Sequence, residues 1–302
     1  MTAKTRAEGV LLAMTLIWGS TFVIGKVILA EMTPLQMISL RFASSAAILL
    51  AFFHRSIFPL RRDQTVKGVI LGLFLFLGFV TQTIGLTITT ASKSAFVTGM
   101  MVVFVPLLQI AVGKKSPKLG NFLGVLFVMA GLWFLTSPDG ATFNTGDALT
   151  LVCALLFGLY IVYLDSIAGD MTPIQLTFLQ MSTNAVLSLG ALALFDRTPL
   201  RLTPGSAVAI IYLTLFATIM TTFLQTKFQK DTTPTRAAVI FSFEPVWAAT
   251  LAAFFLGDRL GAGGIAGGVL IISGILVSEL SDSIPVLNRS FEFSGDGPGG
   301  KR

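Results

Sequence analysis

Charged residues are scarce in this chain. Asp, Glu, Lys and Arg make up 12% of its 302 residues, 54% are hydrophobic, and the mean hydropathy is +0.83. A soluble domain of this size presents more charge to water than this. The composition therefore excludes a soluble protein. It predicts a polytopic membrane protein, in which apolar runs of about 20 residues cross the hydrocarbon core as helices.

Cysteine and several catalytic motifs are also nearly or wholly missing. The single cysteine, Cys153, lies in an apolar run and supplies neither an intrachain disulfide nor a metal site. The sequence has no GxxxxGK loop followed by Ser or Thr, as in ATP-driven pumps, and no HExxH or GxSxG motif. It also lacks the paired acidic motifs that would hold Mg²⁺ in a membrane transferase. We therefore expect no enzyme activity, no metal and no cofactor.

Ten apolar runs predict an all-α integral membrane protein with ten transmembrane helices. The expected spans are residues 8–30, 34–53, 66–86, 92–112, 120–136, 147–167, 173–195, 207–227, 235–256 and 263–280. The first run lacks a small-residue cleavage site, so we expect a retained helix rather than a signal peptide. The polar segment 281–302 is expected to be a flexible cytoplasmic tail.

Basic residues gather in alternate loops. The loops on the side of the N-terminus hold Lys4, Arg6, Arg55, Arg61, Arg62, Lys67, Lys114, Lys115, Lys118, Lys227, Lys230 and Arg236. The opposite loops hold only Lys93, Arg197, Arg201 and Arg259. Because basic loops stay inside, both termini are expected in the cytoplasm, with the chain in the cell inner (plasma) membrane. The net charge of +6 thus reports orientation, not nucleic-acid binding. The expected partners are the lipid bilayer and a small-molecule substrate, and the oligomeric state stays open.

An internal repeat joins the two halves of the chain. The sequence MTPLQ at 32–36 recurs as MTPIQ at 171–175, an offset of 139 positions. The same offset joins Gly19 to Gly158 and Pro106 to Pro245, whereas 92–95 matches 235–238 at an offset of 143. The two expected repeats, 8–136 and 147–280, hold five spans each, so the second copy must be inverted in the membrane. Inverted repeats are typical of secondary transporters, which bind substrate near the midplane.

Three segments resemble one family. LIWGSTFVIGK (16–26), leading to Arg41 and Phe42, resembles the opening of EamA-type transporters of the drug/metabolite transporter superfamily. TPTRAAVIFSFEPVWAATLAAFFLGDRL (233–260) and GIAGGVLIISGILVSEL (264–280) are similar to further segments of that family. The resemblance covers about residues 10–280, and it implies two inverted five-helix repeats around a central cavity and transport of small metabolites, often outward. It departs at Asp258, where the family usually has Glu. Because the family exports amino acids, other metabolites and cationic drugs, it does not fix the substrate.

Glu244 is the most unusual residue of the expected ninth span. It lies about ten residues, or roughly 15 Å, from the helix start, close to mid-bilayer. A carboxylate at that depth is costly and marks a candidate functional site. Burial disfavours its charged form, so Glu244 could load and release a proton, or bind a cationic group. A structural or gating role is the alternative.

Pro106 and Pro245 are expected to bend their spans, because proline lacks a backbone donor and frees the carbonyl one turn earlier. We interpret them as cavity-lining hinges, with a static packing kink as the alternative. Lys93 and Arg236 lie at matching positions near the starts of the fourth and ninth spans. They are expected to form the two rims of the pathway, unless they are ordinary boundary charges.

Further candidates for substrate binding lie within other spans. Trp18 and Tyr160 are deeper than an interfacial aromatic belt and could stack on a planar or cationic ligand, or simply pack. Arg41 needs a carboxylate, carbonyl or water partner, with Glu31 as a structural candidate and a ligand carboxylate as the functional one. Lys26 can extend its ammonium outward. Among the polar residues in or near the ends of apolar helices we select Gln82 as a candidate for substrate binding. The others are Gln109, Gln225, Thr81, Thr221 and Thr222, and some of these polar residues should face the bundle interior.

The sequence thus favours a secondary transporter of a small metabolite, with an amino acid or related compound as the leading example and export as the expected direction. Alternating access would occur by rocking of the two halves. Within transporters the rival is a sugar-nucleotide or phosphorylated-substrate exchanger, which would call for several cavity-facing cations. From other classes the rivals are a membrane-embedded lipid-modifying enzyme, which would call for paired mid-depth carboxylates, and a non-transporting scaffold.

Overall fold

The described chain is helical throughout. The computed structural model describes residues 2–112, 117–136, 143–255, 257 and 261–289, and these contain no β-strand. Eight of its helices are long and apolar enough to cross a membrane: Ala3–Ile28, Pro34–Ile57, Arg62–Ile88, Ala91–Ala111, Thr145–Ile167, Pro173–Phe195, Pro204–Asp231 and Pro234–Phe255. Two shorter apolar helices, Leu119–Phe134 and Ala262–Ser278, correspond to the fifth and tenth expected spans. The all-α membrane class is therefore confirmed, while the count of ten crossings stays a prediction.

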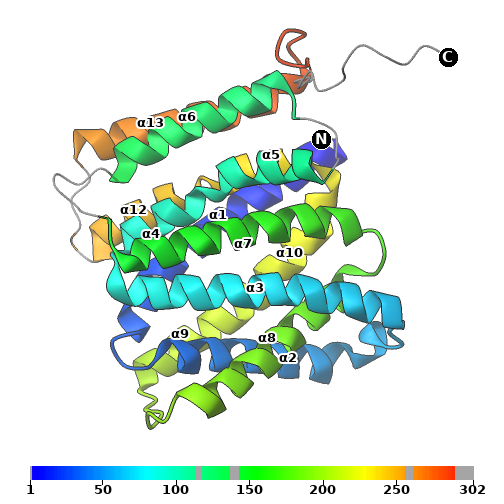
Figure 1. The fold of residues 1–302 in the computed structure, drawn as a ribbon, viewed down its shortest axis with the longest axis vertical. Helices are drawn as coiled ribbons and strands as arrows, with labels where there is room; N and C mark the ends of the chain where they lie inside the picture. The colour runs from blue at the N-terminus through cyan, green and yellow to red at the C-terminus, as the bar shows by residue number, and fades with distance from the viewer. Residues whose placement is uncertain (1, 113–116, 137–142, 256, 258–260, 290–302) are drawn as a thin grey trace.

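Three of the long helices are interrupted, so Figure 1 divides them into shorter elements. The elements are α1 (Ala3–Ile28), α2 (Pro34–Ile57), α3 (Arg62–Ile88), α4 (Ala91–Gly99), α5 (Met101–Ala111), α6 (Leu119–Thr136), α7 (Thr145–Ile167), α8 (Pro173–Phe195), α9 (Pro204–Thr214), the π-helix η1 (Leu215–Met220), α10 (Thr221–Phe228), the 3₁₀ turn η2 (Gln229–Asp231), α11 (Pro234–Phe241), α12 (Glu244–Phe255), α13 (Ala262–Glu279) and the 3₁₀ turn η3 (Leu280–Asp282).

The repeated MTPxQ sequence forms the same helix start twice. Thr33 caps α2 by accepting a hydrogen bond from the Gln36 amide, and the Gln36 side chain accepts one from the Thr33 amide. Thr172 and Gln175 do the same for α8. In both helices the proline occupies the first turn, where its missing backbone donor costs nothing. Local sequence therefore fixes where both helices begin.

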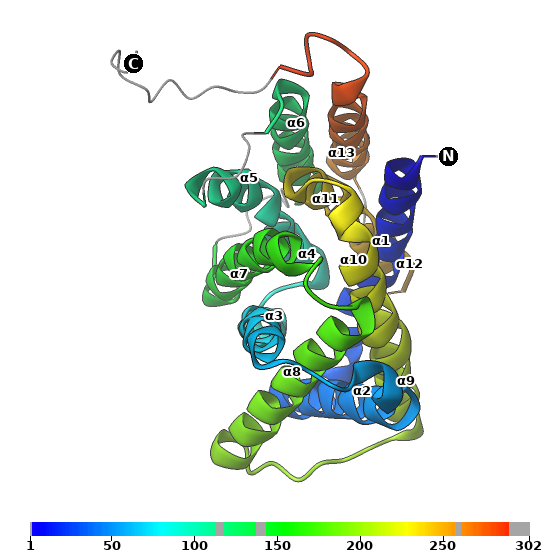
Figure 2. The same cartoon turned by 90° about the vertical axis from the view of Figure 1, so that its right-hand side faces the viewer.

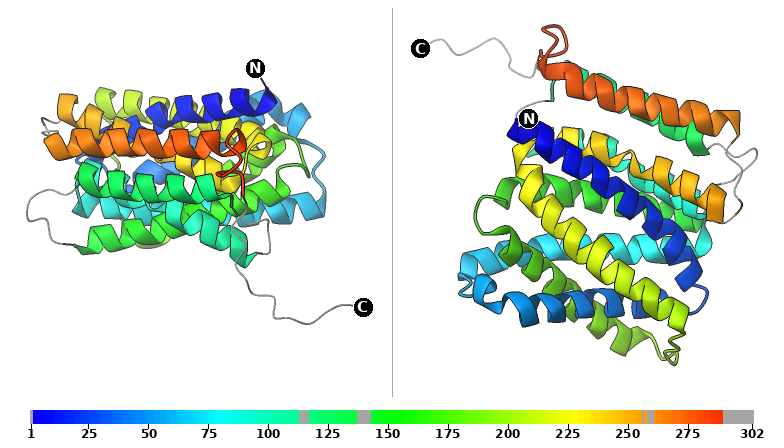
Figure 3. Two further views of the ribbon diagram at one scale, coloured as in Figure 1. Left: turned by 90° about the horizontal axis from the view of Figure 1, so that it is seen from above. Right: turned by 180° about the vertical axis from the view of Figure 1, so that it is seen from behind.

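The helices run side by side across the view of Figure 1, and the bundle is elongated at right angles to them. The pair α6 and α13 forms one edge, and α2, α8 and α9 lie at the opposite edge (Figure 2). Between these edges α7 packs against α3, α4 and α5, while α1 packs against α10, α11 and α12. The start of α1 and the end of α13 lie at one end of the bundle (Figure 3), which we call the terminal end. The start of α7 lies at the other end, which we call the far end.

The segment after η3 turns back onto α6. The amides of Leu119 and Gly120 donate to the carbonyls of Arg289 and Leu287, at 2.8 and 3.0 Å. The expected flexible tail begins in this segment, and its residues 290–302 lie outside the part of the chain that the structure describes.

Candidate functional site

All three interrupted helices reach the centre of the bundle, and two of the interruptions lie near the prolines expected to bend their spans. One separates α11 from α12 at Ser242 and Phe243, directly before Glu244 and Pro245. The other separates α4 from α5 at Met100 and precedes Pro106, which lies inside α5. An interruption therefore lies beside Pro245 as expected, but the one in the first half lies six positions before Pro106.

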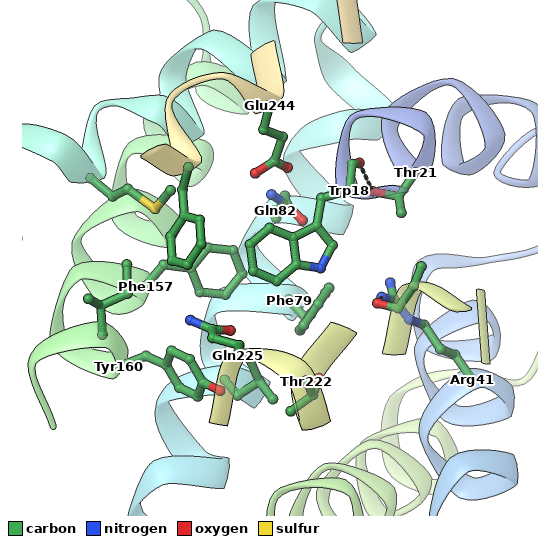
Figure 4. Close-up of a pocket in the computed structure, with 15 residues that line it drawn as sticks. Trp18, Thr21, Arg41, Phe79, Gln82, Phe157, Tyr160, Thr222, Gln225 and Glu244 are labelled. Carbon is green, nitrogen blue, oxygen red and sulfur yellow. Dashed lines mark hydrogen bonds between the residues drawn. The ribbon is translucent and has the colours of Figure 1, made fainter. Parts of the chain in front are cut away.

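A small cavity occupies the centre (Figure 4). Its volume is about 60 Å³, which is room for a few water molecules. It is lined by Trp18 and Thr21 of α1, Arg41 of α2, Leu75, Phe79 and Gln82 of α3, Met101 of α5, Phe157, Tyr160 and Ile161 of α7, Ala217 of η1, Thr222 and Gln225 of α10, Phe241 of α11 and Glu244 of α12. All five residues predicted to bind substrate, Glu244, Arg41, Trp18, Tyr160 and Gln82, therefore line one cavity. Their role stays a prediction.

Glu244 is the only carboxylate among the lining residues. It is the first residue of α12, and its side chain is 8% exposed. Figure 4 shows the carboxylate pointing into the cavity. No described residue donates a hydrogen bond or forms an ion pair with it. The start of a helix favours negative charge, so the local field offsets part of the cost of burying this group.

Arg41 is the only cation among the lining residues and is 4% exposed. Its Nη2 donates to the Ala217 carbonyl at 2.8 Å, and its Nε donates to the Thr218 hydroxyl. Both acceptors belong to η1, whose wider π-helical turn displaces backbone groups from the usual ladder. The guanidinium also lies over the Phe79 ring, 4.6 Å from its centroid. A buried guanidinium is thus held by neutral groups alone within the described residues.

The expectation that Glu31 would neutralise Arg41 is wrong. Glu31 instead accepts a hydrogen bond from the Thr203 hydroxyl at 2.7 Å. No carboxylate of the described chain lies within ion-pair distance of the Arg41 guanidinium. The partner found is a backbone carbonyl, that of Ala217, which was also among the partners expected for Arg41. A ligand carboxylate at Arg41 stays a prediction.

The other three predicted binding residues are held in place by neighbours. The Trp18 ring meets Phe241 edge-on, with centroids 5.1 Å apart. The Tyr160 hydroxyl donates to Gln180 Oε1 at 2.7 Å, so its ring forms a fixed wall. Gln82 Nε2 donates to the Thr98 hydroxyl at 3.1 Å. These contacts leave the aromatic faces and the Gln82 carbonyl oxygen as the surfaces that a ligand could meet.

Lys93 and Arg236 do not line the cavity; they lie in ion pairs at opposite ends of the bundle. At the far end Lys93 Nζ lies 2.5 Å from Asp147, whose side chain is fully buried. At the terminal end Arg236 Nη1 lies 3.2 Å from Glu8. In this structure both cations are in closed, largely buried contacts. A gating role for them stays a prediction.

Several lining residues were not singled out from the sequence. Gln225 and Thr222 were named only as polar residues of an apolar run, and that polarity was the available signal. Phe79, Met101 and Ile161 carry no such signal, because the same residue types cover the lipid-facing surface. Only the packing of α3, α5 and α7 brings them to the centre.

Comparison with known proteins identifies the family. The model of the EamA-like transporter family matches residues 5–137 and again 144–280. An uncharacterized transporter of Archaeoglobus fulgidus is 32% identical over 267 residues, which cover 88% of this chain and 83% of the relative. The uncharacterized inner membrane transporter YedA of Escherichia coli is 24% identical, with coverage of 89% and 90%. A solved protein structure superposes with a TM-score of 0.77 at 16% identity, covering 91% of this chain and 97% of that one, which shows a shared fold. With its apolar helices, this chain is a multi-pass membrane transporter and belongs to the EamA-like transporter family.

Proposed function

We propose that this protein is a secondary transporter that exports a small metabolite, an amino acid or a related compound, by alternating access through the central cavity. The observation that carries the proposal is the pair of opposite charges on one cavity. Glu244 and Arg41 both line it, and neither forms an ion pair within the described chain. A zwitterion would satisfy both, its carboxylate at Arg41 and its ammonium at Glu244. Trp18 and Tyr160 would then cover the apolar part of the ligand.

Two inverted five-helix repeats, 8–136 and 147–280, are part of this proposal. The two separate matches to the family model support them. So do reciprocal contacts: Gln36 Nε2 donates to the Thr198 carbonyl at 2.8 Å, and Gln175 Nε2 donates to the Pro59 carbonyl at 3.4 Å. Both donors and acceptors are related by the same offset of 139 positions. With α6 and α13 as crossings, ten helices result.

A second set of reciprocal contacts supports the same repeats. The offset of 139 carries Glu8 to Asp147, and the offset of 143 carries Lys93 to Arg236. The ion pair of Glu8 with Arg236 at the terminal end is therefore the repeat of that between Asp147 and Lys93 at the far end. Inverted copies would place equivalent contacts at opposite membrane faces.

We further propose that the terminal end faces the cytoplasm and the far end faces outside. The excess of basic residues near the terminal end supports this orientation, because basic loops resist translocation. Rocking would then be accompanied by bending at the interruptions near Met100 and Pro245, with Pro106 easing the bend within α5. The ion pairs of Lys93 and Arg236 would act as gates that hold the two ends of the pathway closed.

The rival substrate classes have less support. A phosphorylated substrate would need several cations in the cavity, and among its lining residues Arg41 is the only one. A lipid-modifying enzyme would need paired carboxylates, and the same lining supplies only Glu244. Family and relatives also point to transporters rather than enzymes.

Transport by the purified protein in liposomes tests the proposal. We expect uptake of radiolabelled amino acids, found first by screening amino acids, nucleosides, sugars and cationic drugs for those that raise the unfolding temperature. The substitution Arg41→Gln should lower the affinity for carboxylate-bearing substrates about ten- to hundredfold, because the protein loses a hydrogen bond to a charged group.

The matched control is Arg55→Gln, a change of the same charge at the exposed end of α2. It should leave transport unchanged. If Arg41→Gln reduced the transport of every substrate equally, including substrates without a carboxylate, this would contradict carboxylate binding by Arg41 and indicate a role in folding.

A further inference from the structure

Lys26 bridges two helices at the far end of the bundle. It lies in the last turn of α1 and is partly buried. Its Nζ donates to the carbonyls of Leu86 and Thr89 at 2.8 and 2.7 Å, and these carbonyls lie where α3 ends. The last carbonyls of a helix lack intrahelical donors and carry partial negative charge, so they attract a cation. Lys26 therefore joins α1 to α3 through its ammonium instead of extending it outward.

The acceptor side of this bridge is anchored. The Thr89 hydroxyl donates to Asp147 Oδ1 at 2.8 Å, and Asp147 in turn pairs with Lys93 at 2.5 Å. Thr89 is thereby fastened to α7 and α4, whereas Lys26 belongs to α1, which packs with α10, α11 and α12. The bridge thus adds a polar contact where α1 packs against α3 and α4.

An extension of the cavity reaches the neighbourhood of the bridge. A smaller cavity of about 20 Å³ shares Thr21, Arg41 and Gln82 with the central one, and it continues to Thr83, Gly25 and Leu86. Gly25 precedes Lys26 in the chain, and Leu86 supplies one of its carbonyl acceptors. A Cβ added at Gly25 would lie 3.3 Å from Leu86 Cδ2, so α1 and α3 are close here. The extension of the cavity therefore reaches Gly25 and Leu86, next to the Lys26 contact.

The repeat does not place a second lysine at the position equivalent to Lys26. The repeat offset of 139 carries Lys26 to Asp165, and a carboxylate cannot donate to backbone carbonyls. By contrast, the anchor itself is repeated, because the Thr232 hydroxyl donates to Glu8 as the Thr89 hydroxyl donates to Asp147. The two ends thus share the anchor and differ in their cationic contacts: Lys26 joins α1 to α3 at the far end, whereas Arg236 joins α11 to Glu8 of α1 and to the Ser278 carbonyl of α13 at the terminal end.

We propose that Lys26 is the latch that holds the far end of the transport pathway closed. Opening to that side separates α1 from α3, and the ammonium leaves the Leu86 and Thr89 carbonyls. Because these hydrogen bonds exist only while α1 and α3 are together at the far end, Lys26 biases the conformational equilibrium away from the state open to the far side. Lys26 is a positioning residue and does not contact the substrate. The inference rests on the proposed alternating access and orientation.

Thiol accessibility tests the latch. The reporter is Thr83→Cys in a Cys153→Ala background, since Thr83 lines the smaller cavity and is 3% exposed. A membrane-impermeant methanethiosulfonate reagent is applied from outside to intact cells. In the Lys26→Met variant we expect about tenfold faster labelling, because losing hydrogen bonds from a charged donor shifts a two-state equilibrium by about that factor.

A second reporter separates release of a latch from loosening of the fold. Gln225→Cys, on the other side of the central cavity, is labelled from the cytoplasmic face in inside-out vesicles. Its labelling should become slower in Lys26→Met, because the population of the outward-open state grows and that of the inward-open state falls. Faster labelling of both reporters, or a change of less than about twofold at Thr83→Cys, would overturn the proposal.

Three further variants complete the design. Lys26→Arg keeps a cationic donor and should label at a rate close to the parent. Lys67→Met removes a lysine that pairs with Asp170 on the surface, and it should change neither reporter. Lys26→Gln, with a shorter neutral donor, should shift both reporters in the direction of Lys26→Met and serves if that variant does not express. Labelling needs no substrate, so this result is independent of the transport assay.

Discussion

The two ionisable residues of the cavity, Glu244 and Arg41, differ in what holds them. Arg41 is fixed by Ala217, Thr218 and the Phe79 ring, and a guanidinium keeps its charge at any physiological pH. Glu244 accepts no hydrogen bond from the described chain and can change its charge. Arg41 is therefore suited to permanent recognition of an anionic group, whereas Glu244 is suited to carrying a proton during transport.

Replacement of Glu244 by Gln should abolish the pH dependence of transport. The amide keeps the size of the side chain but cannot titrate, so rates measured between about pH 5 and 8 should become flat. The comparison is with Glu31→Gln, since Glu31 binds Thr203 at the far end and not in the cavity. Unchanged pH dependence in Glu244→Gln would limit Glu244 to a structural role.

At the scale of helices, Gly19 fixes how closely α1 approaches α12. A Cβ added there would lie 2.5 Å from Trp247 Cβ and 2.9 Å from the Glu244 carbonyl oxygen. The missing side chain thus lets Trp18 and Glu244 meet at one cavity. Its repeat counterpart, Gly158, is less crowded, with Phe104 Cβ at 3.2 Å.

Gly19→Ala should therefore lower stability by about 1–3 kcal/mol, because the clash involves backbone atoms that cannot turn away. Gly158→Ala should have a smaller effect, and Gly9→Ala, also on α1, should have none or be slightly stabilising, since no atom lies within 4 Å of its added Cβ. Thermal unfolding of the purified variants in detergent provides the measurement. Equal midpoints for Gly19→Ala and Gly9→Ala would show that α1 can shift without cost.

At the scale of the whole molecule, the orientation in the membrane determines whether the terminal end or the far end of the bundle faces the cytoplasm. Arg62 begins α3 at the terminal end, and Phe143 is 66% exposed before α7 at the far end. Single substitutions Arg62→Cys and Phe143→Cys, made in a Cys153→Ala background, should react with an impermeant thiol reagent from the cytoplasmic and the external face, respectively. The opposite pattern would reverse the orientation and exchange the roles of the two ends.

The fold class was predictable because a helix must be about 20 apolar residues long to cross a bilayer. The interruption at Met100 was not, because no proline lies within five residues of it. Glu244 and Arg41 were predictable as charges within apolar runs. The partners of Arg41 were not predictable, because Thr218 is 177 positions away in the sequence and lies on a π-helix that no local sequence pattern indicates. Lys26 was underestimated for the same reason: its acceptors lie 60 and 63 positions ahead in the sequence.

The ion pair of Glu8 with Arg236 has a consequence for how the chain is made. The two residues are 228 positions apart, so at about 5–20 residues per second the ribosome delivers Arg236 roughly 10–50 s after Glu8. During that interval α1, the first helix synthesised, waits in the membrane without α10, α11 and α12. A chain released by a premature stop before Arg236 would lack most of α11 and all of α12, against which α1 packs most extensively, and would expose that face of α1 to quality-control proteases. The first helix therefore completes its packing only when the last third of the chain has been made.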